Sequence, residues 1–494
     1  MDKVNEFEHG IESRLSERMD NLIFSEKSNI HFMHHDMDEL VNTPKGKNNL
    51  INMIDLFLRH QKERIEILDA YSKGQNYSVL HGQRRLEKNK ADYRARHNWG
   101  GYISSFITGY VAGNEIGVEV RNDSETNIES IQEIIEINDL KTTDYELAYD
   151  TSRYGRAFEL HYRNEEGQDC IRLIDADEMF VIRDVTVDKE IIGVVHLPII
   201  NDDLYITIYT DKEIISYQPT ESHTISLTEV KRQRHFYDDV PVVEWMNNRF
   251  RNGDFEHQIP IIDLYDSAQS DTANYMSDLN DAMLVINGDF KSADMSTEDV
   301  VKMKDANMLL LESGIDPSGK QQTMSADYIY KKYDVAGTEA YKTRLMNDIY
   351  KLSNVPNLDD DRFYSGQSGI ALQYKMIGLE QIRATKEAFY KRALKRRYRL
   401  ISNVHRNLND TPINADDLEF VFHPNIPQDV WEEVQQYLSA GGELSQETLS
   451  GLTTFINDYE DEKVRLDNES APYTDDALLF FNQERSVGDG TDET

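Results

Sequence analysis

The chain has 494 residues, and its 90 acidic side chains outnumber 53 basic ones, giving a formal net charge of −37. This balance argues against a protein that coats nucleic acid through cation–phosphate contacts and against one that docks on an anionic membrane surface. Apolar residues make up 39% and aromatic residues 10% of the chain, which predicts folded domains rather than disorder. The length suggests roughly two to four folding units.

The single cysteine, Cys170, excludes an intramolecular disulfide and a cysteine zinc cluster. It lies within a β-rich region, beside Ile171, so we expect a packed small side chain rather than a nucleophile. The N-terminus lacks the apolar core and cleavage site of a signal peptide. No window is apolar and long enough to predict a membrane span.

The N-terminal half of the chain is expected to be helical first and β-rich later. A polar segment ends in a loop at 43–47, and an amphipathic helix covers 49–72. A second helix runs from Trp99 to about Gly109 and is followed by a strand. From 154 to 243 the apolar pattern changes to a period of two, which indicates short strands.

Long helices dominate the C-terminal half. Apolar residues at three- or four-residue steps predict a helix over 259–286, with Asp263, Asp271, Asp278 and Asp281 on its opposite face. A compact insertion, 283–333, contains a strand at 308–311. A helix over 338–353 and a loop over 354–369 follow. A helix from Ile370 to about Arg406, on the order of 55 Å long, precedes a strand at 418–422.

Two motifs suggest chemistry, and each has a simpler explanation. Gly314–Gln321 matches GxxxxGK, but Gln321 replaces the Ser or Thr that a phosphate loop uses to hold magnesium, and Asp316 would oppose phosphate. A turn-rich surface loop accounts for the same residues. No other catalytic constellation is present in the sequence.

A histidine-rich segment is the second motif. His31, His34 and His35, with Asp36 and Asp38, have i, i+3, i+4 spacing that would place the histidines on one helix face. No HExxH motif accompanies them, so a solvated polar face is favoured over a metal site.

Two charged features remain. Asp359, Asp360 and Asp361 lie together between two helices and must face water, a cation or a lumen. The long helix carries a local reversal of charge, which suggests pairing with an acidic neighbouring subunit or contact with nucleic acid. An exposed helix with intrachain ion pairs is an equal alternative. The basic residues concerned are Lys391, Arg392, Lys395, Arg396, Arg397 and Arg399.

The order of these pieces resembles the portal proteins of tailed bacteriophages, in the group like the portal of Bacillus phage SPP1. Four stretches carry the resemblance: Tyr102–Gly113, Val240–Asn248, Ser353–Pro356 with Ser365–Leu372, and Leu438–Thr448 followed by Asn457–Glu462. They are similar to the family's early helix and turn, its strand before an acidic helix, its loop entering a long helix, and its "aG.iS.eT" ending.

The resemblance implies an α+β portal-type fold with a β-rich wing, a small α/β clip and a helical crown. The implied segments are an N-terminal polar segment 1–48, wing 49–258, first stem helix 259–282, clip 283–333, second stem helix 334–353, tunnel loop 354–369, long helix with return to the wing 370–424, crown 425–470 and acidic tail 471–494. The tunnel-loop residues expected to face DNA are Asp359, Asp360, Asp361, Arg362, Ser365, Gln367 and Ser368.

The function that the resemblance implies is structural. Subunits form a ring, usually twelvefold, at one capsid vertex, and double-stranded DNA passes through its channel during packaging and ejection. The implied partners are the major capsid and scaffolding proteins, the large terminase and a head-completion adaptor, with no membrane, no cofactor and no catalysis. Assembly in the host cytoplasm and a final place in the virion follow.

The acidity then has a physical purpose, because a lumen of carboxylates repels phosphates that Lys or Arg would hold. Two other functions remain open from the residues alone. One is a nucleotide-driven enzyme built on Gly314–Lys320, and the other is an acidic scaffold or adaptor without a channel.

Overall fold

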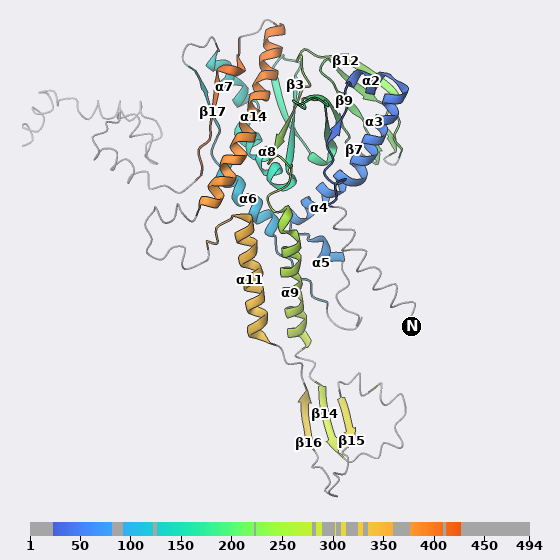
Figure 1. Ribbon diagram of the computed structural model, residues 1–494, viewed down its shortest axis with the longest axis vertical. Helices are drawn as coiled ribbons and strands as arrows, with labels where there is room; N and C mark the ends of the chain where they lie inside the picture. The colour runs from blue at the N-terminus through green and yellow to red at the C-terminus, as the bar shows by residue number, and fades with distance from the viewer. Residues whose placement is uncertain are drawn as a thin grey trace, which may run out of the picture. The chain divides into compact units, whose positions relative to one another are not determined.

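The structure is a computed structural model that describes residues 23–81, 92–121, 126–221, 224–278, 283–288, 302, 308–312, 325–329, 334–358, 376–408 and 412–425 (Figure 1). The chain divides into two compact units after Asn425, and residues 426–494 lie outside the described residues. All but the first residue of the expected crown and the whole acidic tail therefore lie outside them as well. Within the described ranges, no helix has the length and apolarity needed to cross a membrane.

Helices follow the short first strand of the described chain. Helix α2 (Met37–Asn42) leads into α3 (Pro44–Leu56), a π-helical turn (Phe57–Gln61) and α4 (Lys62–Ser72). The expected loop at 43–47 is wrong, because Thr43 Oγ1 accepts a hydrogen bond from the Gly46 N–H at 2.9 Å and caps α3. Pro44 occupies the first helical position, where its missing N–H costs nothing. A Cβ at Gly46 would lie 2.0 Å from the Glu39 carbonyl oxygen, so only glycine allows this tight turn between α2 and α3.

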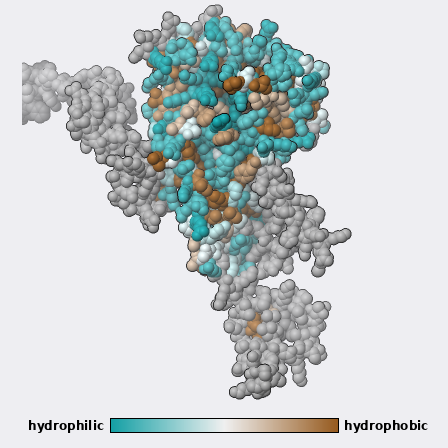
Figure 2. All heavy atoms as spheres, in the orientation of Figure 1, coloured by the Kyte–Doolittle hydropathy of each residue, from teal (hydrophilic) through white to brown (hydrophobic). Residues whose placement is uncertain are grey.

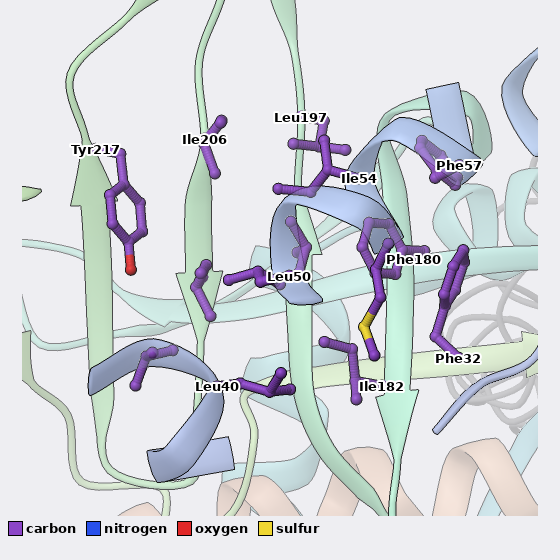
Figure 3. Packing of buried hydrophobic residues seen from close by; sticks show 14 of the residues in the cluster. Phe32, Leu40, Leu50, Ile54, Phe57, Phe180, Ile182, Leu197, Ile206 and Tyr217 are labelled. Carbon is purple, nitrogen blue, oxygen red and sulfur yellow. The ribbon is translucent and has the colours of Figure 1, made fainter. Parts of the chain in front are cut away.

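Helices α2 and α3 cover one face of a six-stranded sheet (Figure 3). The strand order is β1-β5-β6-β9-β10-β12, with β1 parallel to β5 and the other pairs antiparallel. All of these strands except β1 confirm the β-rich region expected over 154–243, and β1 lies outside it. The strands are β1 (Phe32–Met33), β5 (Met179–Arg183), β6 (Ile191–His196), β9 (Thr207–Tyr209), β10 (Glu213–Tyr217) and β12 (Glu229–Arg234).

The core of this layer is apolar and closely packed. Leu50, Ile54 and Phe57 project from the helices and have no exposed surface. They meet Phe180 and Ile208 of the sheet, and the rings of Phe57 and Phe180 lie 5.1 Å apart. Each fully buried side chain of this kind contributes about 1.5–3 kcal/mol, so this cluster fixes the helices on the sheet.

A second sheet, of order β13-β3-β4, packs against long helices. Its central strand β3 (Arg156–Arg163) pairs antiparallel with β13 (Val242–Met246) and β4 (Asp169–Ile174), which holds the buried Cys170. Trp245 of β13 is fully buried, with its ring 5.2 Å from that of Tyr390. The helices around the sheet are α6 (Trp99–Ala112), α7 (Ile128–Ile137), α8 (Leu140–Tyr154) and α14 (Ile377–Leu408).

The expected strand near 418–422 is present as β17 (Leu418–Val421), which pairs with β2 (Gly117–Val120). Three short strands form a further sheet: β7 (Ile199–Ile200), β8 (Asp203–Leu204) and β11 (Thr220–Glu221). The remaining short elements among the described residues are α5 (Tyr77–His81) and the 3₁₀ turns η2 (Ala176–Glu178), η3 (Glu256–Gln258) and η5 (Ala415–Asp417).

Two helices flank a small sheet in the sequence. Helix α9 (Ile259–Asp278) ends earlier than expected, because 283–286 belongs to strand β14 (Met283–Gly288). β14 pairs with β15 (Met308–Glu312) and β16 (Ser325–Ile329), and α11 (Val335–Ser353) follows. The chain therefore combines helices with largely antiparallel sheets, an α+β organisation.

Candidate functional site

The long helix α14 is about 48 Å long and carries the basic residues that the sequence analysis singled out. Arg397 does not face solvent, DNA or a neighbouring subunit, because it is fully buried in its own chain. Its Nη2 lies 2.6 Å from Glu159 Oε2 and 2.5 Å from Asp144 Oδ1. For Arg397 the expectation of an external contact is wrong, and the intrachain alternative holds.

The carboxylates around Arg397 respond differently to their surroundings. Burial alone would raise the pKa of Glu159, but the Arg397 guanidinium and a hydrogen bond with His161 lower it to about 2. Burial raises the pKa of Asp144 despite its contact with Arg397. Glu159 is therefore the charged partner of Arg397, and its stabilising contribution is complete above about pH 4.5 and is lost as the pH falls through about 2.

The other basic residues of the helix differ in exposure and in the groups they contact. Arg396 Nη2 lies 2.9 Å from Asp239 Oδ1 and also donates to the carbonyl of Val240, so it too has an intrachain partner. Lys391 and Arg392 are exposed and lie over the rings of Phe422 and Phe389. Lys395 and Arg399 are exposed and stay candidates for an external contact.

Helices α9 and α11 form an antiparallel pair, which we call the helix pair (Figure 1). Gln258 Nε2 donates to the Leu352 carbonyl at 3.1 Å, and Lys342 Nζ lies 3.4 Å from Gln269 Oε1. Hydrophobic side chains gather on the surface of the pair (Figure 2), among them Leu264 at 50% and Leu352 at 54% exposure. Within the described part of the chain, both leucines keep about half of their surface exposed.

An extended segment, 92–98, lies along α9 and joins the helix pair to α6. The Tyr93 N–H donates to Asn274 Oδ1 at 2.7 Å and the Ala95 N–H to Ser270 Oγ at 2.9 Å. The His97 N–H donates to Asp266 Oδ1 at 3.1 Å. We call this segment the strap.

The strap and the helix match in spacing. Every second amide of an extended chain recurs after about 6.6 Å, and every fourth residue of an α-helix after about 6.0 Å. Asp266, Ser270 and Asn274 are four residues apart and almost fully buried, so each can serve one amide. Sequence reasoning missed this face, although polar residues repeating at i, i+4, i+8 inside an amphipathic helix were the available signal.

We expect Ser270→Ala to loosen the strap. The Ala95 N–H would lose its buried acceptor, at a cost of about 1–3 kcal/mol, and should exchange with solvent deuterium about tenfold faster or more. Ser277→Ala, on the same helix, is the matched control and should leave the Ala95 amide unchanged. Equal exchange rates in the two variants would show that the strap does not depend on this hydrogen bond.

Asp263, another carboxylate of α9, has a raised pKa. Tyr71 Oη donates to Asp263 Oδ1 at 2.8 Å. Burial raises the pKa of Asp263 to about 6, with the neighbouring Asp266 carboxylate adding to the rise. Asp263 was expected on the helix face opposite the apolar stripe, yet it packs toward α4 and not into open solvent.

Several expected site residues lie outside the described residues. These are the tunnel-loop residues Asp359, Asp360, Asp361, Arg362, Ser365, Gln367 and Ser368. The GxxxxGK stretch at 314–321 also lies outside them. The described chain leads toward the loop from α11, and the residue after this helix, Asn354, has a left-handed conformation with φ of 57°.

The histidines do not share a helix face. His31 precedes β1, and its Nδ1 lies 3.2 Å from Arg251 Nη1. Burial and the cations Arg251 and Arg156 lower the pKa of His31 to about 4. His34 and His35 lie in the turn between β1 and α2, because Asp36 is the residue that caps α2. The expected placement of the three histidines on one helix face is therefore wrong.

Comparison with known proteins decides the family. The model of a family described as phage portal protein, SPP1 Gp6-like, matches residues 58–474. The chain belongs to this family. The match covers most of the sequence and confirms the resemblance found in the four short stretches.

Two individual relatives and one solved structure are similar to this chain. The portal protein of Bacillus phage SPP1 is 22% identical over 434 residues, covering 82% of each chain. The portal protein of Clostridium phage phiCD119 is 24% identical over 314 residues, covering 59% of this chain and 66% of its own. A solved HK97-family phage portal protein from Corynebacterium diphtheriae matches with a TM-score of 0.35 and 11% identity. The match covers 66% of this chain and 93% of that protein.

A portal protein is a structural component of the virion, and its family forms the channel at one capsid vertex through which DNA is packaged and ejected. The α+β organisation of this chain, with its long helices and β-rich region, suits that structural role. The family gives no support to the nucleotide-driven enzyme that the GxxxxGK stretch suggested.

Proposed function

We propose that this chain assembles into a closed ring of twelve subunits whose channel carries double-stranded DNA into and out of the capsid. The family match over residues 58–474 is the observation that carries the proposal. The helix pair would line the channel with the loop 354–369, and 283–333 would form the clip. In this arrangement the six-stranded sheet and its helices belong to the wing.

The exposed surface of the helix pair supports the ring. Leu264 and Leu352 are about half exposed on neighbouring helices, and a second copy of the chain would cover them. Each subunit of a ring has neighbours on two sides, so faces that are unpartnered in one subunit become buried on assembly.

The net charge of −37 supports passage rather than binding of DNA. Carboxylates facing the lumen repel phosphates, and no counterions are released by contact, so the duplex slides without being held. Asp359, Asp360 and Asp361 would form a negative collar where the loop approaches the DNA.

Partners outside the ring follow from the same role. The clip, 283–333, would receive the large terminase, which supplies the ATPase, and a head-completion adaptor would follow it after packaging. The wing would contact the major capsid and scaffolding proteins. The exposed Lys395 and Arg399 of α14 are candidates for contact with an acidic surface of a neighbouring subunit.

The collar is tested by replacing Asp359, Asp360 and Asp361 with lysine. The variant should form rings and yet package shorter DNA, because lysines grip phosphates, and the defect should ease as salt rises since screening acts over roughly 8 Å at physiological ionic strength. The measurement is the packaged DNA length per particle across a salt series.

A matched control changes the same charge elsewhere. Asp188, Asp202 and Asp203 are exposed in the β-rich region, and their replacement by lysine should leave packaged lengths normal. Normal lengths for the loop variant at every salt concentration would contradict the placement of these aspartates beside DNA.

A further inference from the structure

A cluster of metal-binding side chains lies in the turn between β1 and α2. One donor atom from each of His34, His35 and Glu39 lies within 4.8 Å of the other two. We propose that these three residues bind a divalent transition-metal ion of the zinc type. Two imidazole nitrogens and one carboxylate oxygen form a donor set that Zn²⁺ accepts, with a fourth position left for water or an external side chain.

The backbone of the cluster is fixed on both sides. Phe32 of β1 and Met37 of α2 are each only 6% exposed and belong to the main apolar core. The His34 N–H donates to the Arg183 carbonyl at 2.9 Å, which anchors the turn to β5. Metal sites need ligands held by rigid elements, and this turn is short and tied to a packed sheet.

The His34 ring has the support that metal-binding histidines usually have. Its Nδ1 lies 2.8 Å from the Asp36 carbonyl oxygen, to which an Nδ1–H can donate. That tautomer leaves the lone pair on Nε2 for a metal, and it orients the ring. The Asp36 amide lies 3.2 Å from the same nitrogen, so metal binding would select between two available tautomers.

His35 and Glu39 already meet. His35 Nε2 lies 2.7 Å from Glu39 Oε2, and the His34 and His35 rings have centroids 4.4 Å apart. Bonds of about 2.0–2.2 Å in a tetrahedral zinc site place neighbouring donors about 3.3–3.6 Å apart. Small side-chain rotations therefore bring all three donors to one ion, which would replace the proton between His35 and Glu39.

Access and charge also suit a cation. The His35 side chain is 62% exposed, so an ion can reach the cluster from solvent. The carboxylates of Asp36 and Asp38, which flank the cluster in sequence, add negative charge to that of Glu39. His31 is excluded from the cluster by its contact with Arg251.

The test is zinc titration of the full chain after treatment with a chelator, followed by calorimetry. The wild type should bind one more Zn²⁺ per subunit than the double variant His34→Ala, His35→Ala. Glu39→Gln keeps the side-chain volume and should weaken binding at this site about tenfold or more, a loss of the size seen when the environment of a metal site is damaged. Co²⁺ in place of Zn²⁺ should give a visible absorption band that the double variant lacks.

The control variant is His81→Ala, because His81 is an exposed histidine on α5. This variant should bind Zn²⁺ like the wild type. Equal zinc stoichiometry in the wild type and the double variant would overturn the proposal, as would an equal loss in the control. Displacement of Zn²⁺ by an equal concentration of Ca²⁺ would also overturn it, since that result indicates an oxygen site. Because Glu39 is on the surface side of α2, the Glu39→Gln variant remains informative if the double variant folds poorly.

Discussion

Replacing Arg397 with alanine is expected to lower the free energy of unfolding by about 3–5 kcal/mol, although the residue sits on a helix that looks basic and solvated from its sequence. The guanidinium is buried between Glu159 and Asp144, and its removal leaves two carboxylates without their cation. Denaturant unfolding followed by circular dichroism, at fixed subunit concentration, measures the loss.

Two comparisons separate charge from volume. Arg397→Met keeps most of the bulk and should be nearly as harmful as alanine at pH 8. Stranded buried carboxyls have raised pKa values, so either variant should recover relative to the wild type as the pH falls from 8 to 5. Arg399→Ala, two residues further along the helix at an exposed position, should change stability by no more than about 0.5 kcal/mol. Equal losses for Arg397→Ala and Arg399→Ala would contradict the buried ion pair.

The second large effect concerns assembly. Replacing both Leu264 and Leu352 with aspartate should break the ring into small species. Each leucine buried at a subunit contact contributes about 1.5–3 kcal/mol, so losing both weakens one contact by about 3–6 kcal/mol, or roughly a hundredfold or more. The new carboxylates would also have to be buried without partners. Native mass measurement of the purified variant gives the distribution of assemblies.

Val187 provides the matched control, because it is 97% exposed in the β-rich region. Val187→Asp adds the same charge to an exposed apolar site and should assemble like the wild type. Intact rings in the Leu264→Asp, Leu352→Asp variant would place the subunit contacts on another surface.

The strands and long helices could be predicted from the sequence because their patterns are local. The period-two region became strands β3 to β13, and apolar steps of three or four marked α9 and α11. The absence of helix-breaking residues marked α14. Boundaries were less predictable. Thr43 and Pro44 look like a loop, yet together they begin a helix, since a capping hydroxyl and a proline suit its first turn.

Contacts between distant segments could not be read from spacing. Arg397 and Arg399 are two residues apart, but one is buried and the other exposed. The packing of α14 on β13 and the contacts of Arg397 with Glu159 and Asp144 separate them. The histidines show the same limit. Their spacing suggested one helix face, whereas the helix begins at Met37, and Glu39 rather than His31 completes the cluster.

The central claim is that this chain forms a ring with a DNA channel, and imaging of the purified full chain by negative-stain electron microscopy, with native mass measurement of the same sample, tests it most directly. We expect closed rings with a central hole and a mass corresponding to about twelve subunits, in line with closed cyclic symmetry. Monomers alone at micromolar concentration and physiological salt, with no ring in the images, would contradict it.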